Sequence, residues 1–105
     1  MKFAANLSMM FTEVAFEDRF QAAAEAGFSA VEYLFPYEWA PDLLASILSN
    51  SNLQLVLFNM PPGDWDAGER GVASLPGRDQ DFRHGIAPAI TYARTLDLTR
   101  LHCMA

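Results

Sequence analysis

The stretch LQLVLF, Leu53–Phe58, is the part of the sequence that most directly predicts the fold. It is a nearly continuous apolar run, which is typical of a parallel strand buried on both faces. We predict two strands before it, Phe3–Leu7 and Ala30–Phe35, and a fourth after it, Arg100–Met104. Amphipathic segments separate these runs, so the sequence predicts a βαβαβαβ order with helices covering a parallel sheet.

Three segments between the strands have the apolar spacing of helices. The first follows Thr12, which can cap a helix, and stops at Gly27. The second runs over 41–50 and begins with a proline, as helices often do. The third covers Asp79–Leu96, and Pro88 inside it should kink or divide it. Its expected apolar face consists of Phe82, Ile86, Ile90 and Ala93.

The composition indicates one globular domain. The chain has 105 residues, of which 51% are hydrophobic, and a net charge of −6. This acidic balance argues against a nucleic acid or an anionic membrane as the partner, because both attract an excess of lysine and arginine. The single cysteine, Cys103, excludes an intramolecular disulfide and a thiolate zinc site, and we expect it to be a core thiol. A reducing cytoplasm is the compartment that suits such a chain.

The predicted strand count is small for a closed architecture. A TIM (β/α)8 barrel needs about 250 residues, whereas this chain offers four strands and three helices. We therefore expect residues 1–105 to be a single incomplete domain, the amino-terminal part of such a barrel. The alternative is a complete, small, flavodoxin-like α/β domain whose outer strand edges would be bare.

A long loop, FNMPPGDWDAGERG, follows the strand at 53–58. Connections in compact domains usually have about two to six residues, and the loops at the carboxyl ends of parallel strands carry the chemistry. Trp65 is a candidate lid residue that would exclude water from a bound ligand, although it can equally anchor the loop. Its acidic residues more plausibly shape the loop than hold a metal; they are Asp64, Asp66 and Glu69.

Four polar residues lie in or at the ends of the predicted strands. Asn6 and Asn59 are placed to contact a substrate, or else to cap loops. Glu32 is a charge within an apolar strand, which indicates either a site inside the barrel or a structural ion pair. His102 can bind substrate oxygens or act as an acid–base group, or it can be a structural strand residue.

Aromatic and basic residues complete the candidate list. Tyr37 in the segment FPY can line a pocket or serve only packing. Arg70 and Arg78 can bind the carboxylate of a small acid substrate, and an arginine–Glu69 pair that holds the loop is the expected role of at least one of them. No cluster of His, Asp and Glu in this sequence has the pattern of a complete metal site.

Four segments resemble the hydroxypyruvate isomerase family, which includes the 2-oxo-tetronate isomerases. They are FAANLSMMFTE (Phe3–Glu13), GFSAVEYLFPY (Gly27–Tyr37), LFNMPPGDWDAGERG (Leu57–Gly71) and LPGR (Leu75–Arg78). The opening segment and the LFN before the loop look closer to the tetronate-type members. The resemblance covers the whole chain.

The resemblance implies a xylose-isomerase-like TIM barrel that isomerises a small 2-oxo sugar acid. In such enzymes two glutamates pass a proton between adjacent carbons, and a divalent ion such as Mg or Mn can polarise the substrate oxygens. The catalytic glutamates and metal ligands are expected beyond Ala105, so this chain should hold no catalytic residue and no metal. Its expected contribution is substrate-wall and lid residues, and alone it should be inactive.

Other functions stay open at this point. One alternative is a sugar epimerase or an abasic-site endonuclease of the same barrel superfamily, although the acidic charge speaks against DNA. Another is a non-catalytic α/β module that associates through its sheet edges. Whether the protein forms a homo-oligomer is also open.

Overall fold

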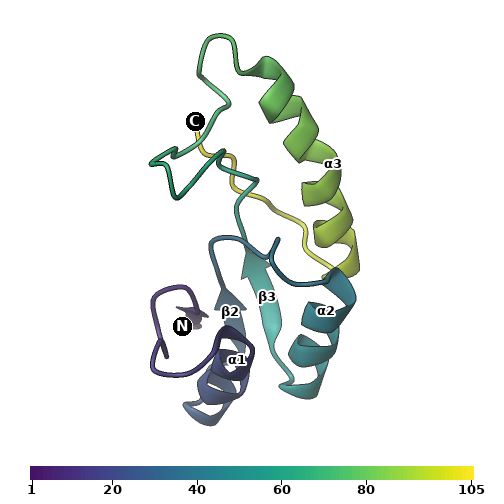
Figure 1. Cartoon of the computed structure of the whole chain (residues 1–105). Helices are drawn as coiled ribbons and strands as arrows, with labels where there is room; N and C mark the ends of the chain where they lie inside the picture. The colour runs from purple at the N-terminus through teal and green to yellow at the C-terminus, as the bar shows by residue number, and fades with distance from the viewer.

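The computed structural model describes all 105 residues and has an open three-stranded sheet with three helices (Figure 1). The strands are β1 (Ala4–Asn6), β2 (Ala30–Glu32) and β3 (Gln54–Leu57), and all are parallel in the order β1-β2-β3. The helices are α1 (Phe16–Glu25), α2 (Pro41–Asn50) and α3 (Asp79–Thr95). The prediction of an α/β chain with parallel strands is confirmed. None of the helices is both long and apolar enough to span a membrane.

The helices cover one face of the sheet and leave the other face open. Ala5, Val31 and Leu55 are aligned in neighbouring strands and are buried in the core. Helix α1 contributes Phe20 to this core, where the side chain has no exposed surface, and α2 contributes Leu44. We call the opposite side, which carries Ala4, Asn6, Ala30 and Glu32, the open face; its residues are exposed or half-buried.

One buried tyrosine lacks a partner in this core. The Tyr33 hydroxyl, just after β2, is buried and makes no hydrogen bond. Its ring packs edge-on against Phe16 and Phe20 of α1, so the side chain stabilises the core through aromatic packing and not through a hydrogen bond. Burial raises the pKa of the Tyr33 hydroxyl above its ordinary value, which keeps the group neutral.

The predicted fourth strand at 100–104 is wrong as an extended element. Only one parallel bridge forms there, between Asn59 and His102. The Phe58 carbonyl accepts the His102 N–H at 3.1 Å, and the Met60 N–H donates to the His102 carbonyl at 2.8 Å. The ladder cannot continue past this point because the next residues, Pro61 and Pro62, have no N–H to donate.

The predicted start of the first helix is also wrong. Thr12 caps no helix, and α1 begins at Phe16 with Ala15 before it and no side-chain cap. The intervening loop is tied back to β1, because the Met9 and Met10 N–H groups both donate to the Asn6 carbonyl. The predicted stop is confirmed, since Gly27 follows the end of the helix at a φ of +99°. Helix α2 has the predicted bounds.

Helix α3 corrects two expectations. Pro88 does not divide it. Pro88 has no N–H to donate to the His84 carbonyl one turn earlier, but both residues lie on the exposed side of the helix, where that carbonyl can bind water. Its expected apolar face is confirmed only in part: Ala93 is buried, but Phe82 and Ile86 are half-buried and Ile90 is 40% exposed. The buried residues are Gly85, Ala89 and Ala93. A Cβ on Gly85 would lie 3.3 Å from the Pro61 ring, so only small residues allow this close approach.

Cys103 is exposed, which contradicts the expectation of a core thiol. It follows the single bridge, in the segment that lies against the loop after β3 and that Figure 1 draws in yellow.

Candidate functional site

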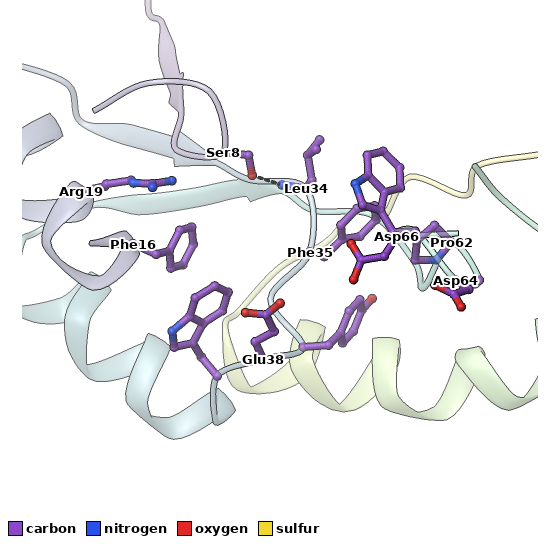
Figure 2. A pocket seen from close by; sticks show the side chains of 13 residues that line it. Ser8, Phe16, Arg19, Leu34, Phe35, Glu38, Pro62, Asp64 and Asp66 are labelled. Atoms are coloured by element: carbon purple, nitrogen blue, oxygen red, sulfur yellow. Dashed lines mark hydrogen bonds between the residues drawn. The ribbon is translucent and has the colours of Figure 1, made fainter. Parts of the chain in front are cut away.

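The loops that follow the three parallel strands enclose a cavity of about 590 Å³ (Figure 2). Parallel strands end at the same edge of a sheet, so their following loops meet there. The β1–α1 loop contributes Ser8, the β2–α2 loop contributes the stretch 34–39 without Pro36, and the β3–α3 loop contributes 62–66. Helix α1 adds Phe16 and Arg19. The cavity is therefore built from segments far apart in sequence.

The β1–α1 loop is held by side-chain hydrogen bonds. The Asn6 side-chain oxygen accepts the Ser8 N–H at 3.0 Å, and the Ser8 hydroxyl oxygen accepts the Leu34 N–H at 2.9 Å. Arg19 donates from Nη1 to the Leu7 carbonyl at 2.8 Å and from Nε to the Val14 carbonyl at 3.0 Å. These bonds place the half-buried guanidinium of Arg19 at the cavity wall.

The β2–α2 loop supplies an aromatic wall. The Trp39 ring stacks on Phe16 with the ring centres 4.2 Å apart, and its indole N–H donates to Glu17 at 2.9 Å. The Tyr92 hydroxyl of α3 donates to the Trp39 carbonyl at 2.6 Å. Trp39 is therefore held from two helices, and the wall it forms is preorganised.

Tyr37 connects this wall to the strand beside it. Its hydroxyl donates to the Asn59 carbonyl at 2.6 Å, and its ring packs edge-on against Phe58 and Tyr92. Burial, and secondarily the neighbouring Tyr92, raise the pKa of Tyr37 above its ordinary value. The hydroxyl is thus a neutral donor that fixes the chain after β3.

The long loop after β3 is held together by its own charged residues. Glu69 accepts the Asp64 N–H and pairs with Arg78, which also pairs with Asp81. The Asp64 carboxylate accepts the Ala67 N–H at 3.1 Å. The contacts agree with the expectation that Asp64 and Glu69 shape the loop. They also show that Arg78, of the two arginines left open, is the one that pairs with Glu69.

Trp65 lies on the cavity side of this loop. Its ring packs edge-on against Phe35, with centroids 5.0 Å apart. Arg70 covers the ring with its guanidinium carbon 3.7 Å from the centroid and donates to the Trp65 carbonyl at 2.9 Å. Trp65 is therefore sandwiched between the β2–α2 loop and Arg70, an arrangement that suits a wall residue.

Acid is expected to loosen this loop. The hydrogen bond from Arg78, followed by that from the Asp64 N–H, lowers the pKa of Glu69 below its ordinary value of 4.5. The ionised carboxylate therefore stabilises the loop above pH 4.5, and this contribution is lost as the pH falls through the lower folded-state pKa. Because exposed ion pairs contribute little globally, the change should be local.

Amide hydrogen exchange at Asp64 across this pH range measures the loosening. The matched control is Glu69→Gln, which should exchange faster at neutral pH and should show no further acid transition at this amide. An acid transition of the same size in Glu69→Gln would contradict the assignment.

Two polar pairs lie apart from the cavity, on the open face. Asn6 and Glu32 are register partners, and the Asn6 amide donates to the Glu32 carboxylate at 3.3 Å. Leu57 pairs with Glu32, and Asn59 follows two residues later on the same side. The Asn59 amide oxygen lies 3.0 Å from His102 Nδ1 and accepts a hydrogen bond from it when the imidazole carries its proton on Nδ1. Asn59 is only 7% exposed.

The seven substrate-binding candidates thus separate into three places. Tyr37 and Trp65 line the cavity, and Arg70 lies over Trp65 without lining it. The other four form the two pairs on the open face; they are Asn6, Glu32, Asn59 and His102.

The sequence interpretation did not single out Arg19, Glu38 or Trp39, although all three line the cavity. Trp39 follows directly on the FPY segment and could have been included with it. Arg19 gave no local signal, because an arginine in an amphipathic helix is ordinarily a surface residue. No three His, Cys, Asp or Glu side chains of the chain come together as a metal site.

Relatives of known identity match almost the whole chain. It is 57% identical to the 2-oxo-tetronate isomerase of Cupriavidus necator over 104 residues, which are 99% of this chain. It is 47% identical to the hydroxypyruvate isomerase of Escherichia coli over the same length. This chain is a homologue of the hydroxypyruvate and 2-oxo-tetronate isomerases. The resemblance inferred from the four sequence segments is confirmed.

The matches cover only part of the length of these relatives. The chain spans 40% of each of these two isomerases. No protein-family model matches it. Among solved structures, the crystal structure of an AP endonuclease, family 2, from Brucella melitensis is similar with a TM-score of 0.97 and 57% identity. The match covers 99% of this isomerase homologue and 40% of that protein.

Proposed function

We propose that this chain is the substrate-wall portion of an isomerase of small 2-oxo sugar acids. The observation that carries the proposal is the 57% identity to a 2-oxo-tetronate isomerase over 99% of the chain. The cavity at the carboxyl ends of the strands supports it, because such loops bind substrates in parallel α/β folds. The proposed compartment is the cytoplasm.

Within this class we propose a 2-oxo-tetronate as the substrate. Identity to the Cupriavidus 2-oxo-tetronate isomerase is 57%, and identity to the Escherichia coli hydroxypyruvate isomerase is 47% over the same number of residues. The reaction would interconvert an oxo group and a hydroxyl on adjacent carbons by proton transfer.

The residues of this chain would bind and enclose the substrate. Trp39 and Trp65 would exclude water from the cavity, and Tyr37 would hold the chain after β3 in place. The open face would line the interior of a TIM barrel, with the Asn6–Glu32 and Asn59–His102 pairs directed inward. The acid–base glutamates would come from outside these 105 residues.

A divalent ion does not fit the side chains of this chain, because no trio of His, Cys, Asp or Glu forms a metal site. In the proposed enzyme the ligands would lie outside these residues. Such an ion, when bound, polarises carbonyl and hydroxyl oxygens.

A hybrid enzyme tests the proposal. In it this chain replaces the matching segment of the Cupriavidus necator 2-oxo-tetronate isomerase. The hybrid is expected to isomerise 2-oxo-tetronate, because the acid–base groups return with the remainder, whereas the 105-residue chain alone is expected to show no turnover. A folded but inactive hybrid, or measurable turnover by the chain alone, would contradict the proposal.

An abasic-site endonuclease is the second candidate, because the similar crystal structure bears that name. The net charge of −6 and the carboxylates of Glu38, Asp64 and Asp66 at the cavity disfavour a phosphate backbone. Incubating the same hybrid with a duplex that contains an abasic site separates the two candidates. Strand cleavage without isomerase activity would favour the endonuclease.

A further inference from the structure

We infer that the cavity is a dipolar site for a short hydroxy acid, in which Arg19 binds the carboxylate and acidic side chains at the other end bind hydroxyls. This inference rests on the proposed function and specifies how its substrate would be recognised. Figure 2 shows the arrangement: Arg19 and Asp64 lie at opposite ends, with Glu38 between them.

Arg19 has unused donors at the cavity wall. Its two hydrogen bonds, to the Leu7 and Val14 carbonyls, use two of the five N–H groups of a guanidinium, so three remain. Nη2 makes no hydrogen bond, and the two ion pairs of the protein both belong to Arg78. A half-buried cation without a carboxylate partner, in a protein of net charge −6, is well suited to an anionic ligand.

The carbonyl bonds also orient the guanidinium. They hold Nε and Nη1 toward the β1–α1 loop, while the Phe16 ring lies 5.9 Å from the guanidinium carbon. Arginine held in this way loses little further freedom when it binds a carboxylate, and its planar donors match two carboxylate oxygens.

Hydrogen-bond acceptors lie further along the cavity, from its middle to the end opposite Arg19 (Figure 2). Glu38 and Asp66 are exposed, line the cavity and make no hydrogen bond to a side chain or ion pair within the protein. Ionised carboxylates only accept hydrogen bonds, so they would accept from hydroxyls and repel a second carboxylate. A ligand with one acid end and hydroxyls along its chain satisfies both ends at once.

The aromatic walls can pack against the C–H groups of the carbon chain of such a ligand. Phe16 and Trp39 are stacked on one side, and Phe35 and Trp65 pack edge-on on the other. The Phe16 ring covers one side of the guanidinium, 5.9 Å from its central carbon, and a partly desolvated arginine attracts a carboxylate more strongly than a fully exposed one.

Two four-carbon probes test the recognition without requiring turnover. Erythronate carries a carboxylate and hydroxyls, and erythritol is the corresponding neutral polyol. Titration of the ¹⁵N-labelled 105-residue chain should show that erythronate binds more tightly, with shifts centred on Arg19, Ser8 and the Trp65 indole. Equal affinity for the two probes would overturn the inference.

Arg19→Gln should weaken erythronate binding by about tenfold or more, because a charge-assisted pair is lost, and should leave erythritol binding unchanged. Arg19→Lys should recover part of the affinity. The matched control is Arg83→Gln on α3, which changes the net charge equally at an exposed position outside the cavity and should leave binding unchanged. Unaltered erythronate binding in Arg19→Gln would overturn the inference.

A measurement on the unmutated chain covers the case in which Arg19→Gln disturbs the β1–α1 loop. Modification by phenylglyoxal, mapped by mass spectrometry, reports the accessibility of each arginine. Erythronate should slow the modification of Arg19 but not of Arg83, and erythritol should protect neither. Absence of selective protection at Arg19 would count against the site.

The hybrid enzyme separates this inference from the proposed function. In an active hybrid, Arg19→Gln should raise KM for 2-oxo-tetronate more than it lowers kcat, because the carboxylate does not react. An active hybrid with an unaffected KM refutes the role of Arg19 while the function stands. If the hybrid is inactive, the function fails, and the probe titrations still decide whether the cavity recognises hydroxy acids.

Discussion

Phe20→Ala is expected to lower the free energy of unfolding of the chain by a large fraction of its total. Phe20 has no exposed surface and packs between α1 and the sheet, where it contacts Phe16 and Tyr33 edge-on. Removing a buried phenyl ring costs about 3–5 kcal/mol in free energy of unfolding, through lost burial and the cavity that remains. Domains commonly have only about 5–15 kcal/mol in total, and this three-stranded sheet is covered on one face only.

Urea denaturation followed by circular dichroism measures this loss. The control is the same substitution at Phe3, whose side chain is 68% exposed, and it should change the free energy of unfolding by much less. Similar midpoints for the two variants would show that the ring of Phe20 does not stabilise the fold.

Gly71→Ala is expected to detach the segment around Met104 from the long loop. Gly71 has a φ of +122°, and a Cβ built there would lie 2.5 Å from the Met104 carbonyl oxygen. That separation is far inside van der Waals contact, and the obstructing atoms are backbone, so a whole segment must shift. The same segment carries His102, so the hydrogen bond between Asn59 and His102 should be lost with it.

Gly68→Ala is the matched control for this prediction. Gly68 has a similar φ of +97°, but a Cβ there would meet nothing within 4 Å. Both variants carry the cost of placing alanine in a left-handed conformation, about 1 kcal/mol or more, and only Gly71→Ala adds the collision. Chemical shifts of the His102 ring and amide report the detachment. Unchanged His102 signals in Gly71→Ala would contradict the prediction.

Much of the fold followed from local sequence patterns. The apolar run at 53–58 predicted a parallel strand, and β3 lies within it. The predicted burial on both faces was wrong, because only Leu55 of β3 is buried and the other face of the sheet is open. Gly27 and Pro41 marked the end of α1 and the start of α2, because the conformational preferences of these two residue types act on the backbone directly. The four segments also placed the chain among the isomerase homologues correctly.

The sequence predicted the candidate site only in part. The long loop was expected at the carboxyl ends of the strands, and Tyr37 and Trp65 do line the cavity there. Arg19 was missed because its place depends on carbonyl groups that the folded β1–α1 loop brings to it, one of them twelve residues away. The face of α3 was predicted only in part: Ala93 is buried as expected, but the close approach of Gly85 to Pro61, which favours a small residue at that position, was missed.

By itself, then, the sequence determined the order of the first three strands and the three helices, the parallel sheet and the family relationship. These properties depend on apolar periodicity, on glycine and proline, and on contiguous motifs, all of which act over a few neighbouring residues. Only the tertiary structure decided that Arg19 faces the cavity and that Asn59 meets His102, 43 residues later. Such contacts depend on how separate elements pack, because burial and steric exclusion between distant segments select the side chains that meet.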